Sequence, residues 1–190
     1  WPLIIVGVGA MINETFSRQM LNWWQDGTAE FKNEQVGIFN ACYKLSILIT
    51  LFIQAFKMGA EPFFFKQAEA GNPQKTYARV MKFFVITCCF MFLFISLFIE
   101  VFGWFFMAID KPLWAQGLQV VPLLALGNIF LGVYYNLSIW YKLTDKNNYG
   151  AMITIAGALI TIGLNIVLIP SLHYLGAALA TFLCYTFMML

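Results

Sequence analysis

Three charged residues stand inside stretches that are otherwise apolar enough to cross a membrane. Glu14 and Arg18 lie four residues apart in "GAMINETFSRQMLNWW", and Lys44 lies in "FNACYKLSILIT". A charge within the membrane costs roughly 2.5–3.5 kcal/mol on insertion scales, so such residues usually face a partner or a water-filled cavity. Arginine and lysine are donors suited to phosphate, and arginine adds a planar fork. The chemistry these residues indicate is the binding of an anion.

The two cations should lie at a similar depth on neighbouring helices. Arg18 is about six residues inside the pair Trp23 and Trp24, and Lys44 is about eight residues inside the second apolar stretch. At 1.5 Å per residue, both are about 10 Å below the outer boundary. Glu14 can offset Arg18, but no carboxylate at matching depth clearly offsets Lys44. Two interpretations stay open: a Glu14–Arg18 bridge with a snorkelling lysine, or a cavity with a cationic wall.

Polar residues on the same helices extend this candidate site. Asn40, Lys44 and Gln54 belong to a mixed stripe on the second helix, which ends at Glu61. Lys57 and Glu61 are spaced for an i, i+4 surface pair. Asn128, Gly132 and Asn136 align on the fourth helix, where packing and a cavity wall are both possible. The candidate substrate-binding residues are Glu14, Arg18, Asn40, Lys44, Gln54, Asn128 and Asn136.

Composition defines the environment of these residues. The chain of 190 residues is 61% hydrophobic and only 11% charged, with a mean hydropathy of +0.76, whereas a soluble domain is about 25% charged. We therefore predict an integral membrane protein. The net charge of +2 gives no support to nucleic-acid binding. A single histidine and four cysteines without a CxxC motif favour neither a metal site nor a His-based catalytic centre. We expect no cofactor and no enzymatic activity.

Continuous apolar runs of helix length predict an all-α membrane protein with six transmembrane helices. A β-barrel would instead alternate with period two. The expected helices span about 1–24, 36–64, 79–106, 115–141, 150–170 and 175–190, within a single helical lobe covering 1–190. Pro122 is expected to kink the fourth helix. Because both ends of the sequence lie inside apolar runs, we expect a fragment of a larger protein.

Loop charges predict the orientation of the bundle. The five connections hold one, four, one, two and no Lys or Arg residues, in chain order. Because positive loops stay on the cytoplasmic side, residues 66–82 and 142–149 should be cytoplasmic, and the other three connections should lie outside. Small residues recur at spacings of three and four in the last two helices, which predicts close helix packing. These residues are Gly150, Thr154, Gly157, Ala158, Thr161, Asn165, Gly176, Ala177, Ala180, Thr181 and Cys184.

Two long stretches carry a resemblance to a known family. The segments "PLIIVGVGAMINETFSRQML" and "VGIFNACYKLSILITLFIQAFKMGAEPFFFKQA" resemble the second half of polysaccharide flippases, in the MATE-like or MOP transporter superfamily. "NLSIWYKLTDKNNYGAMITIAGALITIGLNIVLIPSLHYLGAALAT" is similar to the later helices of that family. The resemblance implies that the six helices are the seventh to twelfth of a 12–14-helix transporter. They would form most of its C-terminal lobe, and the N-terminal lobe of the same chain would be their partner.

The resemblance also implies a function. These proteins flip undecaprenyl-diphosphate-linked oligosaccharide across the bacterial inner membrane for surface polysaccharide or lipopolysaccharide assembly. Alternating access by rocking lobes requires no covalent chemistry. The implied partners are the lipid-linked oligosaccharide and membrane lipids. One alternative is a cation-coupled drug antiporter of the same superfamily, which would need an unpaired deep carboxylate. Another is a membrane-bound polysaccharide polymerase, which would need a large polar outer loop.

Overall fold

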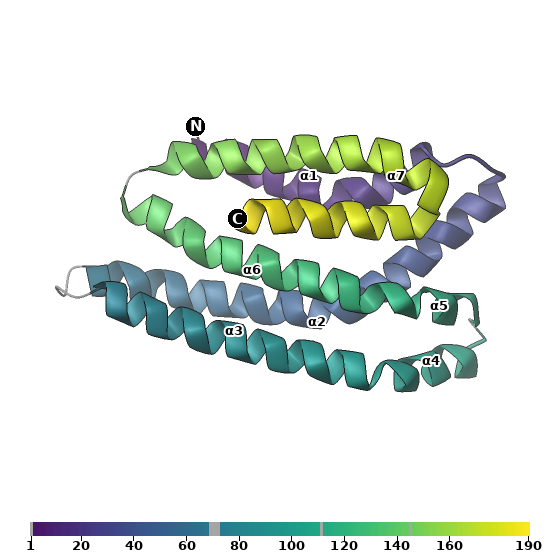
Figure 1. The fold of residues 1–190 in the computed structure, drawn as a ribbon, viewed down its shortest axis with the longest axis horizontal. Helices are drawn as coiled ribbons and strands as arrows, with labels where there is room; N and C mark the ends of the chain where they lie inside the picture. Colours follow the sequence, from purple (N-terminus) through teal and green to yellow (C-terminus); the bar gives the residue numbers. More distant parts are fainter. Residues whose placement is uncertain (1, 69–72, 111, 145) are drawn as a thin grey trace.

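The computed structural model describes the backbone of residues 2–68, 73–110, 112–144 and 146–190. Within these ranges, the side chains of residues 2–7, 10, 14, 68, 73 and 147 are not described. Every regular element in these ranges is helical. The elements are α1 (Pro2–Trp23), α2 (Ala29–Ala68), α3 (Pro73–Leu97), α4 (Ile99–Ala108), α5 (Pro112–Gln116), the 3-10 helix η1 (Gly117–Val120), α6 (Val121–Leu143) and α7 (Asn147–Met189). The long rods lie roughly side by side (Figure 1). The prediction of an all-helical protein is confirmed.

Within the described residues, four helical stretches are long and apolar enough to cross a membrane: Ala29–Gln67, Gln74–Leu97, Pro112–Leu143 and Asn148–Met189. A helix satisfies its own backbone hydrogen bonds, which is why such runs are stable in hydrocarbon. The structure therefore supports a multi-pass membrane protein. α1 has 22 residues but is not among these four stretches.

The longest helix, α7, is a hairpin rather than one straight rod. Pro170 lies inside it, and His173 leaves helical geometry with φ 52° and ψ −127°. The chain reverses at this point, so that the last arm runs back beside the first (Figure 1). The two arms correspond to the segments that we expected at 150–170 and 175–190.

Several helix boundaries differ from the expectation. The third rod is interrupted at Phe98, which has φ −94° and ψ 16° and separates α3 from α4. α2 begins at Ala29 rather than near 36, and the hydroxyl of Thr28 accepts a hydrogen bond from the Phe31 amide at 3.3 Å. Pro122 lies in the first turn of α6, directly after η1, so it begins that helix instead of kinking its middle. Proline is tolerated there because the first-turn amide has no helical acceptor.

α1 packs chiefly against α7, and small residues permit the close approach. A Cβ atom on Gly9 of α1 would lie 2.6 Å from the Thr154 Cγ2 of α7, and one on Gly157 of α7 would lie 3.3 Å from the Asn13 Nδ2 of α1. A larger side chain at either position would require its neighbour to move. The predicted packing role of the small residues in α7 is confirmed at Thr154 and Gly157.

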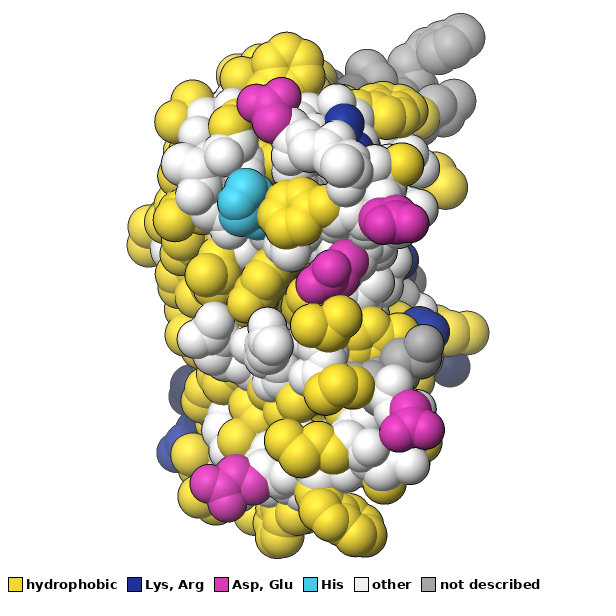
Figure 2. All heavy atoms as spheres, turned by 90° about the vertical axis from the view of Figure 1, so that its right-hand side faces the viewer, with side chains coloured by type: hydrophobic (Ala, Val, Ile, Leu, Met, Phe, Trp, Pro, Cys, Tyr) yellow, Lys and Arg dark blue, Asp and Glu magenta, His cyan; other side chains and the backbone are white. Residues whose placement is uncertain are grey.

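The connections fall at two ends of the bundle. The links α1–α2 and α4–α5 and the turn of α7 lie at one end, and the end of α2, the start of α3 and the α6–α7 link lie at the other (Figure 1). Figure 2 shows the first end, with acidic side chains and a histidine among hydrophobic ones. The grouping matches the alternation of loop charges, in which the two more basic connections share one end.

Single-cysteine labelling tests which end faces the cytoplasm. In a variant without native cysteines, Gln74→Cys and Asn148→Cys are expected to resist a membrane-impermeant thiol reagent in intact cells, whereas Asp26→Cys reacts. All three side chains are exposed in the structure, so access depends on the side of the membrane rather than on burial. Permeabilised cells are the control, because all three cysteines should then react. Labelling of Gln74→Cys but not Asp26→Cys in intact cells would invert the orientation.

Candidate substrate-binding site

Arg18 lies at the contact between α1 and α2. Its guanidinium carbon is 4.3 Å from the centroid of the Tyr43 ring, a cation–π distance. The side chain is half-buried, and its Nε is fully buried without a hydrogen-bond partner among the described atoms. A buried donor left in this state costs free energy. The arginine is therefore held in place by an aromatic face while one donor has no protein acceptor in the described part of the chain.

Glu14 belongs to α1, but its side chain lies outside the described residues. The predicted pairing of Glu14 with Arg18 therefore stays a prediction.

Lys44 and Asn40 lie one helical turn apart on α2 and line the same groove. This groove has a volume of about 490 Å³ and runs between α2 and the aromatic side chains of α4 and α5. Lys44 is exposed and follows Tyr43 directly, so it projects from α2 about 100° away from the ring that contacts Arg18. The two cations thus lie at neighbouring levels of the bundle, but on different sides of α2.

The remaining predicted residues lie farther along the bundle. Gln54 is exposed on α2. Asn128 is buried on α6, and its amide nitrogen donates to the Ser46 Oγ at 3.1 Å across the α2–α6 contact. Asn136 is half-buried, and its amide donates to the carbonyl of Gly132 on its own helix at 3.1 Å. Asn128 therefore has the geometry of a packing contact, one of the two interpretations open for this stripe.

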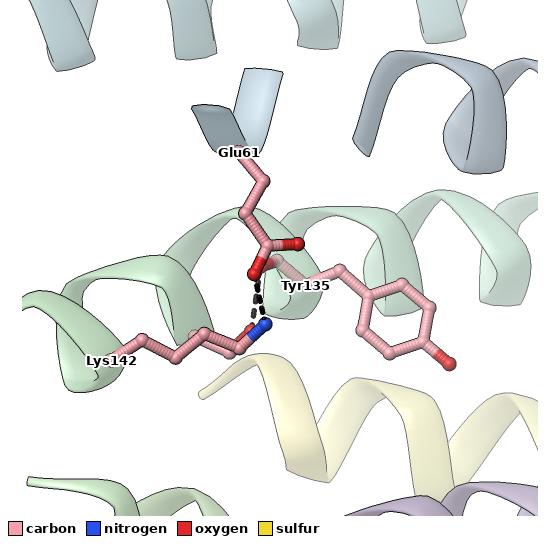
Figure 3. A network of polar contacts seen from close by, with 4 residues as sticks. Glu61, Tyr135 and Lys142 are labelled. Atoms are coloured by element: carbon pink, nitrogen blue, oxygen red, sulfur yellow. Dashed lines mark hydrogen bonds and ion pairs between the residues drawn. The ribbon is translucent and has the colours of Figure 1, made fainter. Parts of the chain in front are cut away.

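The prediction of a surface pair between Lys57 and Glu61 is wrong. Glu61 instead forms its ion pair with Lys142 of α6, as Figure 3 shows. Lys57 places its ammonium 4.4 Å from the centroid of the Tyr135 ring. Spacing along α2 permits an i, i+4 pair, but α6 packs beside α2 and brings a cation to the carboxylate. The ion pair joins two helices at the end of the bundle that we predict to be cytoplasmic.

A buried polar network between α1 and α7 was not predicted as such. Asn13 and Ser17 of α1 contact Thr161, Asn165 and Thr181 of α7. The Thr161 hydroxyl donates to the Asn13 Oδ1 at 3.1 Å, and the Asn165 amide donates to the Ser17 Oγ at 3.1 Å. The Ser17 and Thr181 hydroxyls are 3.2 Å apart.

Part of this network was visible in the sequence. The small-residue stripe of α7 already included Thr161, Asn165 and Thr181. The complementary residues of α1, Asn13 and Ser17, follow Gly9 at spacings of four, a signal that the prediction of close packing did not include. The network explains why α1 and the two arms of α7 form one unit.

The two cations of the candidate site have different surroundings. Arg18 lies beside an aromatic ring and Lys44 lines an open groove, and the described part of the chain holds no group of three or more His, Cys, Asp or Glu side chains placed to bind a metal. The long apolar helices, with Arg18 and Lys44 set among them, indicate a multi-pass membrane protein.

Comparison with known families shows which kind of membrane protein this is. The chain matches the MatE family model over residues 8–167, and it therefore belongs to the MatE family, whose members are membrane transporters of the MOP superfamily. The expected superfamily is confirmed. Neither the comparison with curated proteins nor the comparison with solved structures gave a match.

Proposed function

We propose that this protein is a flippase for a lipid-linked oligosaccharide joined to undecaprenyl diphosphate, acting in the bacterial inner membrane in surface polysaccharide or lipopolysaccharide assembly. The observation that carries the proposal is Arg18, a half-buried guanidinium with a buried donor that lacks a described acceptor. A diphosphate supplies such acceptors. Transfer of this anion through hydrocarbon otherwise requires it to lose water without replacement.

The helical architecture supports the same proposal. α1, α2, the rod of α3 and α4, α6 and the two arms of α7 would be six membrane passages, the seventh to twelfth of a 12–14-helix transporter. Together they would form most of its C-terminal lobe. The N-terminal lobe of the same chain would close the cavity, and rocking of the two lobes would expose the headgroup to each side in turn.

Arg18 and Lys44 have complementary roles in this proposal. Arg18 binds the diphosphate through its fork of donors, and Glu14 orients it. Lys44 adds positive potential at nearly the same depth on the next helix. Arginine suits a planar, two-point contact with phosphate, whereas lysine acts as a point charge. Asn40 and Gln54 are available for the sugar hydroxyls. Asn128 and Asn136 would contact substrate only if their present hydrogen bonds were exchanged.

Deletion of the gene tests the proposed function. Cells without the protein are expected to make the lipid-linked oligosaccharide but to keep it on the cytoplasmic leaflet, and to lose surface polysaccharide. The measurement is extraction of lipid-linked sugars combined with enzymatic probing of their leaflet. Restoration by a plasmid copy is the control. Disappearance of the lipid-linked intermediate would instead place the protein in synthesis, and a changed drug resistance with normal polysaccharide would favour the antiporter.

A further inference from the structure

One face of α3 changes from basic to apolar along its length. Its basic part consists of Lys75, Arg79 and Lys82, which lie in the first three turns and are exposed. The same spacings of three and four continue with exposed apolar residues toward the other end of the helix. These residues are Ile86, Phe90, Leu93 and Leu97. Because residues three and four apart share one side of a helix, the basic and apolar residues form a single stripe, which we call the α3 stripe.

The α3 stripe faces away from the rest of the bundle. α3 lies at the edge of the bundle (Figure 1). Its buried residues Phe84, Cys88 and Ile95 lie on the opposite side of the helix, since each residue turns it by about 100°. In the described part of the chain, no ion pair joins the basic residues of the stripe to a carboxylate, and α3 itself contains no Asp or Glu. The positive charge of the stripe is therefore not balanced by a described neighbour.

The surface is hollowed where the basic part of the α3 stripe meets the apolar part. This hollow has a volume of about 840 Å³ and is lined by Ala78, Arg79, Lys82, Phe83 and Ile86. Guanidinium and ammonium groups bind phosphate, and the exposed apolar residues beyond them suit hydrocarbon chains. The orientation predicted from the loop charges puts the basic part at the cytoplasmic surface, where membrane lipids are anionic. A lipid with an anionic headgroup therefore satisfies both parts of the stripe.

We propose that the α3 stripe binds a cardiolipin-type lipid, in which a glycerol links two phosphates that each carry a diacylglycerol. Arg79 and Lys82 each bind one phosphate at the hollow, Lys75 adds positive potential from the preceding turn, and the acyl chains lie along the apolar part. The three cations are spread over about 10 Å of the helix axis, and a lipid with a single phosphodiester would balance only one of them. None of the candidate substrate-binding residues belongs to the stripe, so the inference stands independently of the proposed flippase function.

Native mass spectrometry of the purified full-length protein tests the proposal, with cardiolipin, phosphatidylglycerol or phosphatidylcholine added separately. Cardiolipin is expected to bind most tightly, phosphatidylglycerol less tightly and phosphatidylcholine least. The double variant Arg79→Gln, Lys82→Gln should lower cardiolipin binding by about 25-fold, because each basic residue close to an anionic lipid contributes a factor of about five.

Two further double variants separate a defined site from general electrostatic attraction. Arg79→Lys, Lys82→Arg keeps the charge of the stripe, so cardiolipin binding should stay within about threefold of wild type. Lys66→Gln, Lys146→Gln is the matched control, because it removes two exposed lysines at the same end of the bundle but outside the stripe. It should change cardiolipin binding by less than about twofold. All of these side chains are exposed, and unfolding temperatures in lipid-free detergent check that each variant is folded.

Competition by the deacylated headgroup of cardiolipin tests whether the ligand is a lipid or a free phosphate compound. At equal concentration the headgroup should not displace cardiolipin, because it makes no contact with the apolar part of the stripe. Displacement would identify a soluble phosphate ligand and overturn the proposal. Equal binding of cardiolipin and phosphatidylglycerol to wild type, or equal cardiolipin binding by the two glutamine double variants, would also overturn it.

Discussion

Replacement of Arg18 by alanine is expected to reduce flipping of the lipid-linked oligosaccharide by about one to two orders of magnitude, because a buried charge-assisted hydrogen bond contributes roughly 1.5–3 kcal/mol. Arg18→Lys should keep part of the activity, since the charge survives but the planar fork does not. The measurement is the fraction of lipid-linked sugar on the outer leaflet, normalised to the amount of protein in the membrane.

The variants of neighbouring residues separate a binding role from a structural one. Lys44→Ala should also reduce flipping, and Glu14→Gln should be milder than either alanine substitution if Glu14 only orients Arg18. A purely structural bridge gives another pattern, in which Glu14→Gln and Arg18→Ala each lower the protein level and the double variant restores it. Normal transport by the double variant Arg18→Ala, Lys44→Ala would reject the cationic-cavity hypothesis.

The helical class of the protein follows from composition, but the positions of the breaks do not. Runs of apolar residues predicted long helices, and these helices are present. The interruption at Phe98 lies in a segment without glycine or proline, so no local signal marks it. Pro122 is easily recognised in the sequence, but whether it bends the helix depends on where the helix begins. A proline in the first turn is tolerated, and one in the middle bends the helix.

The residue types of the candidate site could be predicted from the sequence. The neighbours that each side chain contacts were harder to predict. The presence of charges inside apolar runs singles out Arg18 and Lys44, and helical spacing gives their expected depth. The contact of Arg18 with Tyr43 depends on the rotation of α1 against α2, which spacing within either helix does not determine. Glu61 is a second example. Lys57 satisfies the spacing rule within α2, yet Lys142 reaches the carboxylate from another helix.

Polar residues in membrane helices are the hardest to interpret from sequence. Asn128 and Asn40 are both amides on apolar helices, and both fit a cavity wall. In the structure, Asn128 donates to Ser46, whereas the carbonyl oxygen of Asn40 has no donor among the described residues. The difference comes from what the neighbouring helix supplies at that level. Ser46 faces α6, while the groove beside Asn40 is lined largely by apolar and aromatic side chains.

Replacement of Gly176 by alanine is expected to destabilise the hairpin of α7. A Cβ atom at this position would lie 2.4 Å from the carbonyl oxygen of Leu168 and 3.0 Å from the amide nitrogen of Ile169. Both are backbone atoms, so no side-chain rotation relieves the clash. Ile169 is fully buried, which limits any shift of the first arm. Overpacking of this kind costs about 1–3 kcal/mol and occasionally more.

Gly163→Ala is the matched control in the same helix, because a Cβ atom there meets no neighbouring atom within 4 Å. It should leave stability unchanged or raise it by up to about 1 kcal/mol, since alanine favours the helix over glycine. The measurement is thermal unfolding of the purified variants in detergent, followed by size-exclusion chromatography. Because α1 packs on both arms through the network of Asn13 and Ser17, loss of the turn should loosen α1 as well. Equal unfolding temperatures for the Gly176 and Gly163 variants would show that the two arms do not need this close approach.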